Sequence, residues 1–194
     1  MGYSLSTLAK LPLDTENDFY VFILGVNANW KGGILQTIYE NFDNLAKEIG
    51  PNAIIAKGLN PREWTYELTT KYFGEDAQVD RFFPGILITN SHPDNFDASS
   101  LRILISLEQV EENYANTERF FNLLTDFISR KDMRFLDFAK NSINWVDEIN
   151  KAIDLKPNIL GFGINFNRLI DLIINKKDKV IIDDGKKPAD NTRS

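Results

Sequence analysis

The sequence predicts an α/β domain in which strands and helices alternate around a single sheet. Residues 19–25 form a continuous aromatic and β-branched run of strand length, apolar on both faces, which is typical of a central buried strand. A helical pattern follows over 34–49, and a second short apolar run occupies 53–56. Strand-length runs that alternate with helical patterns are characteristic of α/β proteins. The apolar positions of the first helical pattern are Ile34, Leu35, Ile38, Phe42, Leu45, Ala46 and Ile49.

The clearest local signal is the start of a second helix at Asn60-Pro61-Arg62-Glu63. Asn60 is a good N-cap residue, Pro61 suits the first turn, and Glu63 can complete a capping box. Gly74 ends the pattern. The stripe expected to face the core is Trp64, Leu68 and Tyr72.

Two further strands and a long helix complete the predicted domain. The runs 83–89 and 101–107 have strand character, and the short polar loop between them predicts an antiparallel pair. A helix is expected to begin after Asn116 or Thr117. Its inner face is expected to hold Phe120, Phe121, Leu124, Phe127 and Ile128.

The domain organisation follows from where strand patterns stop. Residues 1–130 are expected to form the α/β domain, although the first eighteen show no clear period and end in a turn-like acidic stretch. Residues 131–175 carry helical patterns alone, which predicts a C-terminal helical extension packed on the domain. Residues 176–194 are predicted to be a charged flexible tail.

Composition restricts the chemistry and the partners of the chain. None of its 194 residues is cysteine, which removes disulfides, thiolate metal sites and cysteine nucleophiles, and fits a cytoplasmic location. The net charge of -6 disfavours nucleic acid as a partner. The longest apolar stretch, 159–174, is interrupted by polar residues, so no membrane span is expected. No cofactor or metal site is indicated.

The predicted order of elements (strand, helix, strand, helix, strand, strand, helix) resembles the thioredoxin fold. Trp30-Lys31-Gly32-Gly33-Ile34 lies between the first strand and first helix, where thioredoxins carry Trp-Cys-Gly-Pro-Cys. Pro84 precedes the third strand, where that family keeps a cis-proline. The resemblance covers roughly 19–130.

The departures from this family concern its chemistry. Lys31 and Ile34 stand where the two redox cysteines belong, and neither side chain can carry out thiol exchange. The resemblance therefore implies a degenerate member that serves as a scaffold or a peptide-binding surface.

The loop before the first predicted helix is a candidate anion site. Lys31, Gly32 and Gly33 precede the helix N-terminus, where free N–H groups and the helix dipole favour negative charge. The loop lacks both the P-loop and the dinucleotide-binding glycine patterns. The alternative interpretation is a strand-to-helix turn that needs small residues.

A second candidate is His92, the single histidine, near Asp94 and Asp97. These residues could form a general base or a metal site. The alternative is a solvated loop in which Asn, Asp and Pro supply turn chemistry. No nucleophile constellation accompanies them, so enzymatic activity is unsupported.

The apolar segment within 157–174 is the least ordinary feature. It could pack on the sheet as the outermost helix, or form an interface with a partner. Burial of five such side chains is worth roughly 7–15 kcal/mol before entropy, so we expect the segment to be docked. The expected partner-binding residues are Phe162, Phe166, Leu169 and Ile173, with Trp30 second.

The sequence thus favours a non-catalytic protein–protein interaction or scaffold module of a cytoplasmic complex. One alternative is a small-molecule or nucleotide-binding enzyme or sensor that uses the Lys31 loop. Another is an accessory component of a bacterial defence system, which no residue demonstrates.

Overall fold

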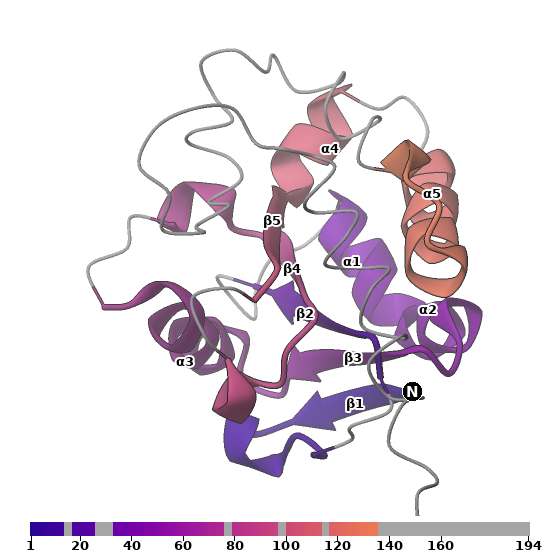
Figure 1. Cartoon of the computed structure of the whole chain (residues 1–194). Coiled ribbons are helices and arrows are strands. Elements are labelled where there is room, and N and C mark those ends of the chain that lie inside the picture. Colours follow the sequence, from indigo (N-terminus) through magenta and orange to yellow (C-terminus); the bar gives the residue numbers. More distant parts are fainter. Residues whose placement is uncertain (14–16, 26–32, 76–78, 97–99, 114–116, 136–194) are drawn as a thin grey trace, which may run out of the picture. The chain divides into compact units, whose positions relative to one another are not determined.

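The computed structural model describes residues 1–13, 17–25, 33–75, 79–96, 100–113 and 117–135, which form a mixed α/β unit (Figure 1). Its five-stranded sheet has the order β1-β3-β2-β4-β5. The strands are β1 (Gly2–Leu5), β2 (Phe19–Leu24), β3 (Ala53–Gly58), β4 (Gly85–Thr89) and β5 (Arg102–Ser106).

The described helices follow β2, β3 and β5 along the chain. The α-helices are α1 (Gly33–Glu40), α2 (Phe42–Ile49), α3 (Pro61–Phe73), α4 (Leu107–Asn113) and α5 (Thr117–Arg130). Three short 3₁₀ turns are η1 (Leu8–Lys10), η2 (Asp80–Phe82) and η3 (Pro93–Asn95).

The sheet combines a parallel half with an antiparallel half. Strands β1 and β2 both run parallel to β3, whereas β4 runs antiparallel to β2 and β5 antiparallel to β4. The predicted antiparallel pair is therefore confirmed as β4 and β5. In the centre, Tyr20 lies opposite Thr89 and Leu24 lies opposite Gly85, so the end of β4 adjoins the start of β2.

Both faces of β2 are buried, as its apolar run predicts, because helices cover the sheet on two sides. One face, with Tyr20, Phe22 and Leu24, packs with the inner stripe of α3. On the other face Phe19 contacts Phe127 of α5, with ring centroids 5.3 Å apart. Figure 1 shows α3 on one side of the sheet and α1, α2 and α5 on the other.

Helix α3 is joined to β2 by hydrogen bonds as well as by apolar contacts. The indole Nε1–H of Trp64 donates to the carbonyl of Ile23 at 3.1 Å. The hydroxyl of Thr65 donates to the carbonyl of Gly25 at 2.7 Å and accepts the Gly25 N–H at 3.0 Å. A methyl group on Gly58 would overlap the Trp64 side chain, so the close approach of β3 to α3 requires glycine there.

The helix expected over 34–49 is two helices, interrupted at Asn41. The Nδ2–H of Asn41 donates to the carbonyl of Thr37 at 3.0 Å, and the backbone N–H of Asn41 uses the same carbonyl. Competition of this kind between an Asn side chain and the helical backbone favours a local break.

The bounds predicted for α3 are confirmed, but its capping box is not. Asn60 occupies the N-cap position and its carbonyl accepts the Trp64 N–H, yet its side chain makes no capping bond. Gly74 ends the helix with φ of 90°. The Phe83–Pro84 peptide bond is cis, as the family resemblance implied.

Two described elements had no counterpart in the sequence prediction. Strand β1 lies within the first eighteen residues, and it pairs at the sheet edge through four residues of which Leu5 alone is buried. Helix α4 starts at Leu107 directly after β5, inside the run assigned to a strand. The helical patterns expected beyond Phe135, and the proposed tail, lie outside the described residues.

Thr65→Val should lower the free energy of unfolding by about 2–4 kcal/mol, because it leaves the buried Gly25 N–H and carbonyl without their partner. The substitution preserves side-chain shape, so packing changes little. Urea denaturation followed by circular dichroism measures the effect. Thr70→Val on the same helix is the matched control, since Thr70 is only half-buried. Equal effects of the two substitutions would refute the role assigned to Thr65.

Candidate functional site

Of the residues predicted for the anion site and the partner-binding surface, the structure describes Gly33, at the start of α1. Of the second candidate site it describes His92 and Asp94. The remaining predicted site residues lie outside the described part of the chain: Trp30, Lys31, Gly32, Asp97, Phe162, Phe166, Leu169 and Ile173.

The N-terminus of α1 carries a carboxylate from α4. The N–H of Ile34 donates to Oε1 of Glu111 at 2.8 Å. Gly33 has φ of 73°, and a Cβ built on it would lie 2.7 Å from Oε1 of Glu111 and 2.8 Å from Oε2. Backbone conformation and space therefore both favour glycine at this position.

This contact bears on the anion site predicted at Lys31, Gly32 and Gly33. A negative charge is favourable at a helix N-terminus because the exposed N–H groups carry partial positive charge. Glu111 supplies that charge from within the chain. An external anion at the Ile34 N–H would have to compete with Glu111.

His92 and Gly33 lie near opposite ends of the central strand β2. His92 follows β4, whose last residue pairs with Tyr20 near the start of β2, whereas Gly33 follows the end of β2 along the chain. A site that combined His92 with the start of α1 would need to span the sheet.

The turn chemistry expected for this loop is present as η3, where Asp94 and Asn95 are exposed. The expected solvation is wrong for His92, because its side chain is only 4% exposed. Its ring makes an edge contact with Tyr20, at 5.7 Å between centroids. The sequence carries one weak indication of this burial, the aromatic residue Phe96 in the same loop. Its ring packs on Tyr72 of α3, with ring centroids 4.8 Å apart, so the loop lies against the helix.

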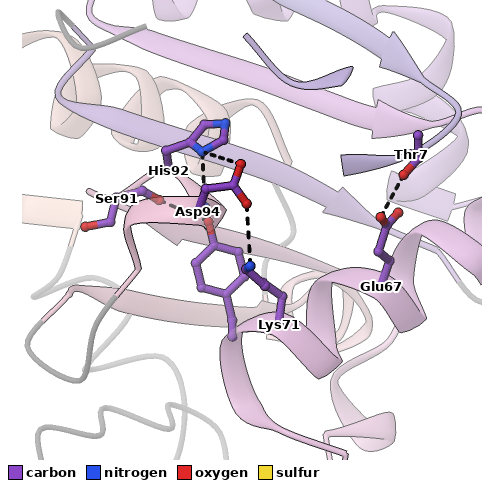
Figure 2. A network of polar contacts seen from close by, with 7 residues as sticks. Thr7, Glu67, Lys71, Ser91, His92 and Asp94 are labelled. Carbon is purple, nitrogen blue, oxygen red and sulfur yellow. Dashed lines mark hydrogen bonds and ion pairs between the residues drawn. The ribbon is translucent and has the colours of Figure 1, made fainter. Parts of the chain in front are cut away.

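Hydrogen bonds tie the His92 loop together. Nδ1 of His92 accepts the N–H of Asp94 at 3.1 Å and so caps η3. The Asp94 carboxylate places Oδ1 3.5 Å from Nζ of Lys71 and Oδ2 3.7 Å from Nδ1 of His92 (Figure 2). Nε2 of His92 is buried and has no hydrogen-bond partner among the described residues.

The C-terminal end of α3 anchors the same region. The hydroxyl of Tyr72 donates to the carbonyl of Ser91 at 3.0 Å, and burial raises the pKa of that hydroxyl, with smaller contributions from Tyr20 and Asp94. Tyr72 therefore remains a neutral donor. The buried guanidinium of Arg102 donates to the carbonyl of Tyr72 at 2.7 Å, where the helix dipole favours a cation.

A third polar cluster lies near the ends of β2 and β3. Nζ of Lys57 sits 4.7 Å from the ring centroid of Tyr39 and 4.4 Å from that of Phe42. Burial lowers the pKa of Lys57, against a smaller raising effect of Asp43. The Tyr39 hydroxyl is buried without a partner among the described residues, and burial raises its pKa. The sequence analysis did not single out these residues, because a lone lysine in a strand carries no local signal.

Among the described residues, no group of three or more histidine, cysteine or carboxylate side chains is arranged to hold a metal ion. In the same part of the chain, no helix is both long and apolar enough to cross a membrane.

Comparison of the chain with protein-family models, with curated proteins and with solved structures finds no match.

Glu111→Ala should lower the free energy of unfolding by about 1 kcal/mol, because the Ile34 N–H loses its acceptor and the α1 N-terminus its negative charge. Glu111→Gln keeps an acceptor and should lose less. Glu108→Ala, an exposed change on the same helix, is the matched control. Thermal denaturation at low and high salt measures the charge contribution, which salt should screen. No difference between Glu111→Ala and Glu108→Ala would contradict the capping role.

Proposed function

We propose that this chain is a cysteine-free, thioredoxin-like module that acts by binding another protein and carries out no thiol chemistry. The described elements support the fold. From β2 onward they follow the order strand, helix, strand, helix, strand, strand, helix, with the first of these helices interrupted at Asn41 and the last followed by α5. Strands β2 and β3 are parallel and joined through helices, whereas β4 and β5 form an antiparallel pair.

The main support for a non-catalytic role is that protein groups already occupy the N-terminus of α1. On the resemblance, Ile34 occupies the position of the second redox cysteine. Its side chain is 3% exposed and belongs to the core, while its N–H is bound to Glu111. In thiol oxidoreductases a helix N-terminus lowers the pKa of a cysteine. Here that end of the helix holds an apolar side chain and a carboxylate.

The partner is proposed to be another protein, for which the sequence supplies the contact residues. The apolar residues Phe162, Phe166, Leu169 and Ile173 remain the proposed surface, with Trp30 second. Within the described part of the chain, two large apolar side chains around the start of α3 are exposed, Leu59 at 69% and Tyr66 at 66%. These two residues are suitable for a control variant, because substitution of exposed side chains should not disturb the core.

The double substitution Phe162→Ser/Phe166→Ser should reduce recovery of a specific partner by at least about tenfold, the effect of losing a binding hot spot. Affinity purification from the source organism, followed by mass spectrometry, compares it with the native chain. Circular dichroism must show that the variant remains folded.

Leu59→Ser/Tyr66→Ser is the matched control, because it removes two exposed apolar side chains elsewhere. Partner loss in the first variant alone would support the proposed surface. If the Phe162→Ser/Phe166→Ser variant keeps the partner, the proposed surface is refuted. If this variant unfolds, the surface is also refuted, and the apolar segment within 157–174 belongs to the core.

A second candidate, binding of a small anionic molecule, is favoured by the cluster around Lys57. Its partly buried ammonium and the unpartnered Tyr39 hydroxyl lie near the end of β2, beside which the Lys31 loop begins. Ligands of open α/β sheets commonly bind at the carboxyl ends of parallel strands. Ligand-induced thermal stabilisation that is lost in both Lys31→Ala and Lys57→Met would support this function over the first.

A further inference from the structure

His92 is the only histidine of the chain, and its two ring nitrogens have different surroundings. Nδ1 accepts the Asp94 N–H at 3.1 Å, and a nitrogen that accepts a hydrogen bond carries no proton. The neutral ring therefore holds its proton on Nε2. That nitrogen is buried and has no acceptor in the described part of the chain.

Titratable groups of η3 and β2 contact the ring, and further titratable and charged groups of α3 and β5 lie beside these. From its own turn, η3, comes the Asp94 carboxylate, with Oδ2 3.7 Å from Nδ1. From α3 come Lys71, which contacts the other carboxylate oxygen at 3.5 Å, and Tyr72. From β2 comes the edge of Tyr20. Arg102 of β5 is bonded to the carbonyl of Tyr72 at the same helix end.

We propose that His92 is a proton-operated latch between η3 and the C-terminal end of α3. A second proton, taken from solvent, can add only at Nδ1, because Nε2 already carries one. Nδ1–H would then face the Asp94 N–H, donor against donor, and the backbone bond would be lost. The Asp94 carboxylate is close enough to rotate and accept the new donor.

Protonation thus exchanges one set of contacts for another. The neutral ring caps η3 by accepting the Asp94 N–H. The Asp94 carboxylate contacts Lys71 through Oδ1, and its Oδ2 lies 3.7 Å from Nδ1 of the ring (Figure 2). The charged ring takes the carboxylate of Asp94, uncaps η3 and weakens the contact to Lys71. Histidine is the side chain that ordinarily changes charge between about pH 5 and 8, so the exchange is tested over that interval.

The test uses the full chain labelled with ¹⁵N, in which the single histidine gives one imidazole spectrum. Above the titration midpoint, the long-range ¹H–¹⁵N spectrum should show the proton on Nε2 and an unprotonated Nδ1. The backbone amide of Asp94 should shift with the same midpoint as the ring. A proton on Nδ1 in the neutral form, or an Asp94 amide that does not follow the ring, would overturn the proposal.

Two substitutions should move that midpoint in opposite directions. Asp94→Asn keeps the backbone N–H but removes the anionic acceptor of the charged ring, so the midpoint should fall. Lys71→Gln releases the carboxylate from its competitor, so the midpoint should rise. Each shift should amount to about 0.2–0.7 pH unit, because the Asp94 carboxylate and the Lys71 ammonium are exposed and solvent weakens their effect. Shifts of the same sign, or none, would refute the exchange of partners.

His92→Asn supplies a cap that cannot titrate, since the Asn side-chain oxygen can accept the Asp94 N–H. The Asp94 amide of this variant should lose its shift between pH 5 and 8. Persistence of the shift would assign it to another group and overturn the latch. Should this variant fail to fold, the Asp94→Asn and Lys71→Gln measurements still decide the proposal.

Discussion

The attachment of α3 to the central strand β2 is the constraint on which the described structure depends. Trp64 and Thr65 bond the end of β2, and their aromatic and apolar neighbours fill one face of the sheet. One turn along, the Glu67 carboxylate accepts the hydroxyl of Thr7 at 2.7 Å and the N–H of Leu8 at 3.0 Å, which positions η1 (Figure 2). At the far end Tyr72 holds the His92 loop. A single helix therefore fixes the central strand, the N-terminal segment and the loop after β4.

The parts of the fold that sequence predicts well are those whose signals are local. Strand β2 is a continuous apolar run, and α3 begins at Asn-Pro and ends at glycine, so each is specified within its own residues. Strand β1 is different, because four residues acquire strand structure only by pairing with β3. The break at Asn41 and the immediate start of α4 likewise depend on side-chain and chain-path details that periodicity does not carry.

The candidate sites were harder to predict because their partners are distant in the sequence. The glycine loop before α1 was identified, but Glu111, which binds the helix start, lies 77 residues from Ile34. His92 was assigned to solvent since its loop is polar, and its burial comes from α3 and β2. Composition indicated what the chain cannot do, whereas long-range contacts decide which polar groups meet.

The Glu111 contact also limits how this domain could change its chemistry. The carboxylate already holds the Ile34 N–H, so a charged or nucleophilic group placed at the start of α1 would meet a fixed negative charge. A neighbouring negative charge disfavours a thiolate, so a thiol introduced there would have a raised pKa. A new anionic or nucleophilic group at this helix start would therefore need a change in α4 as well.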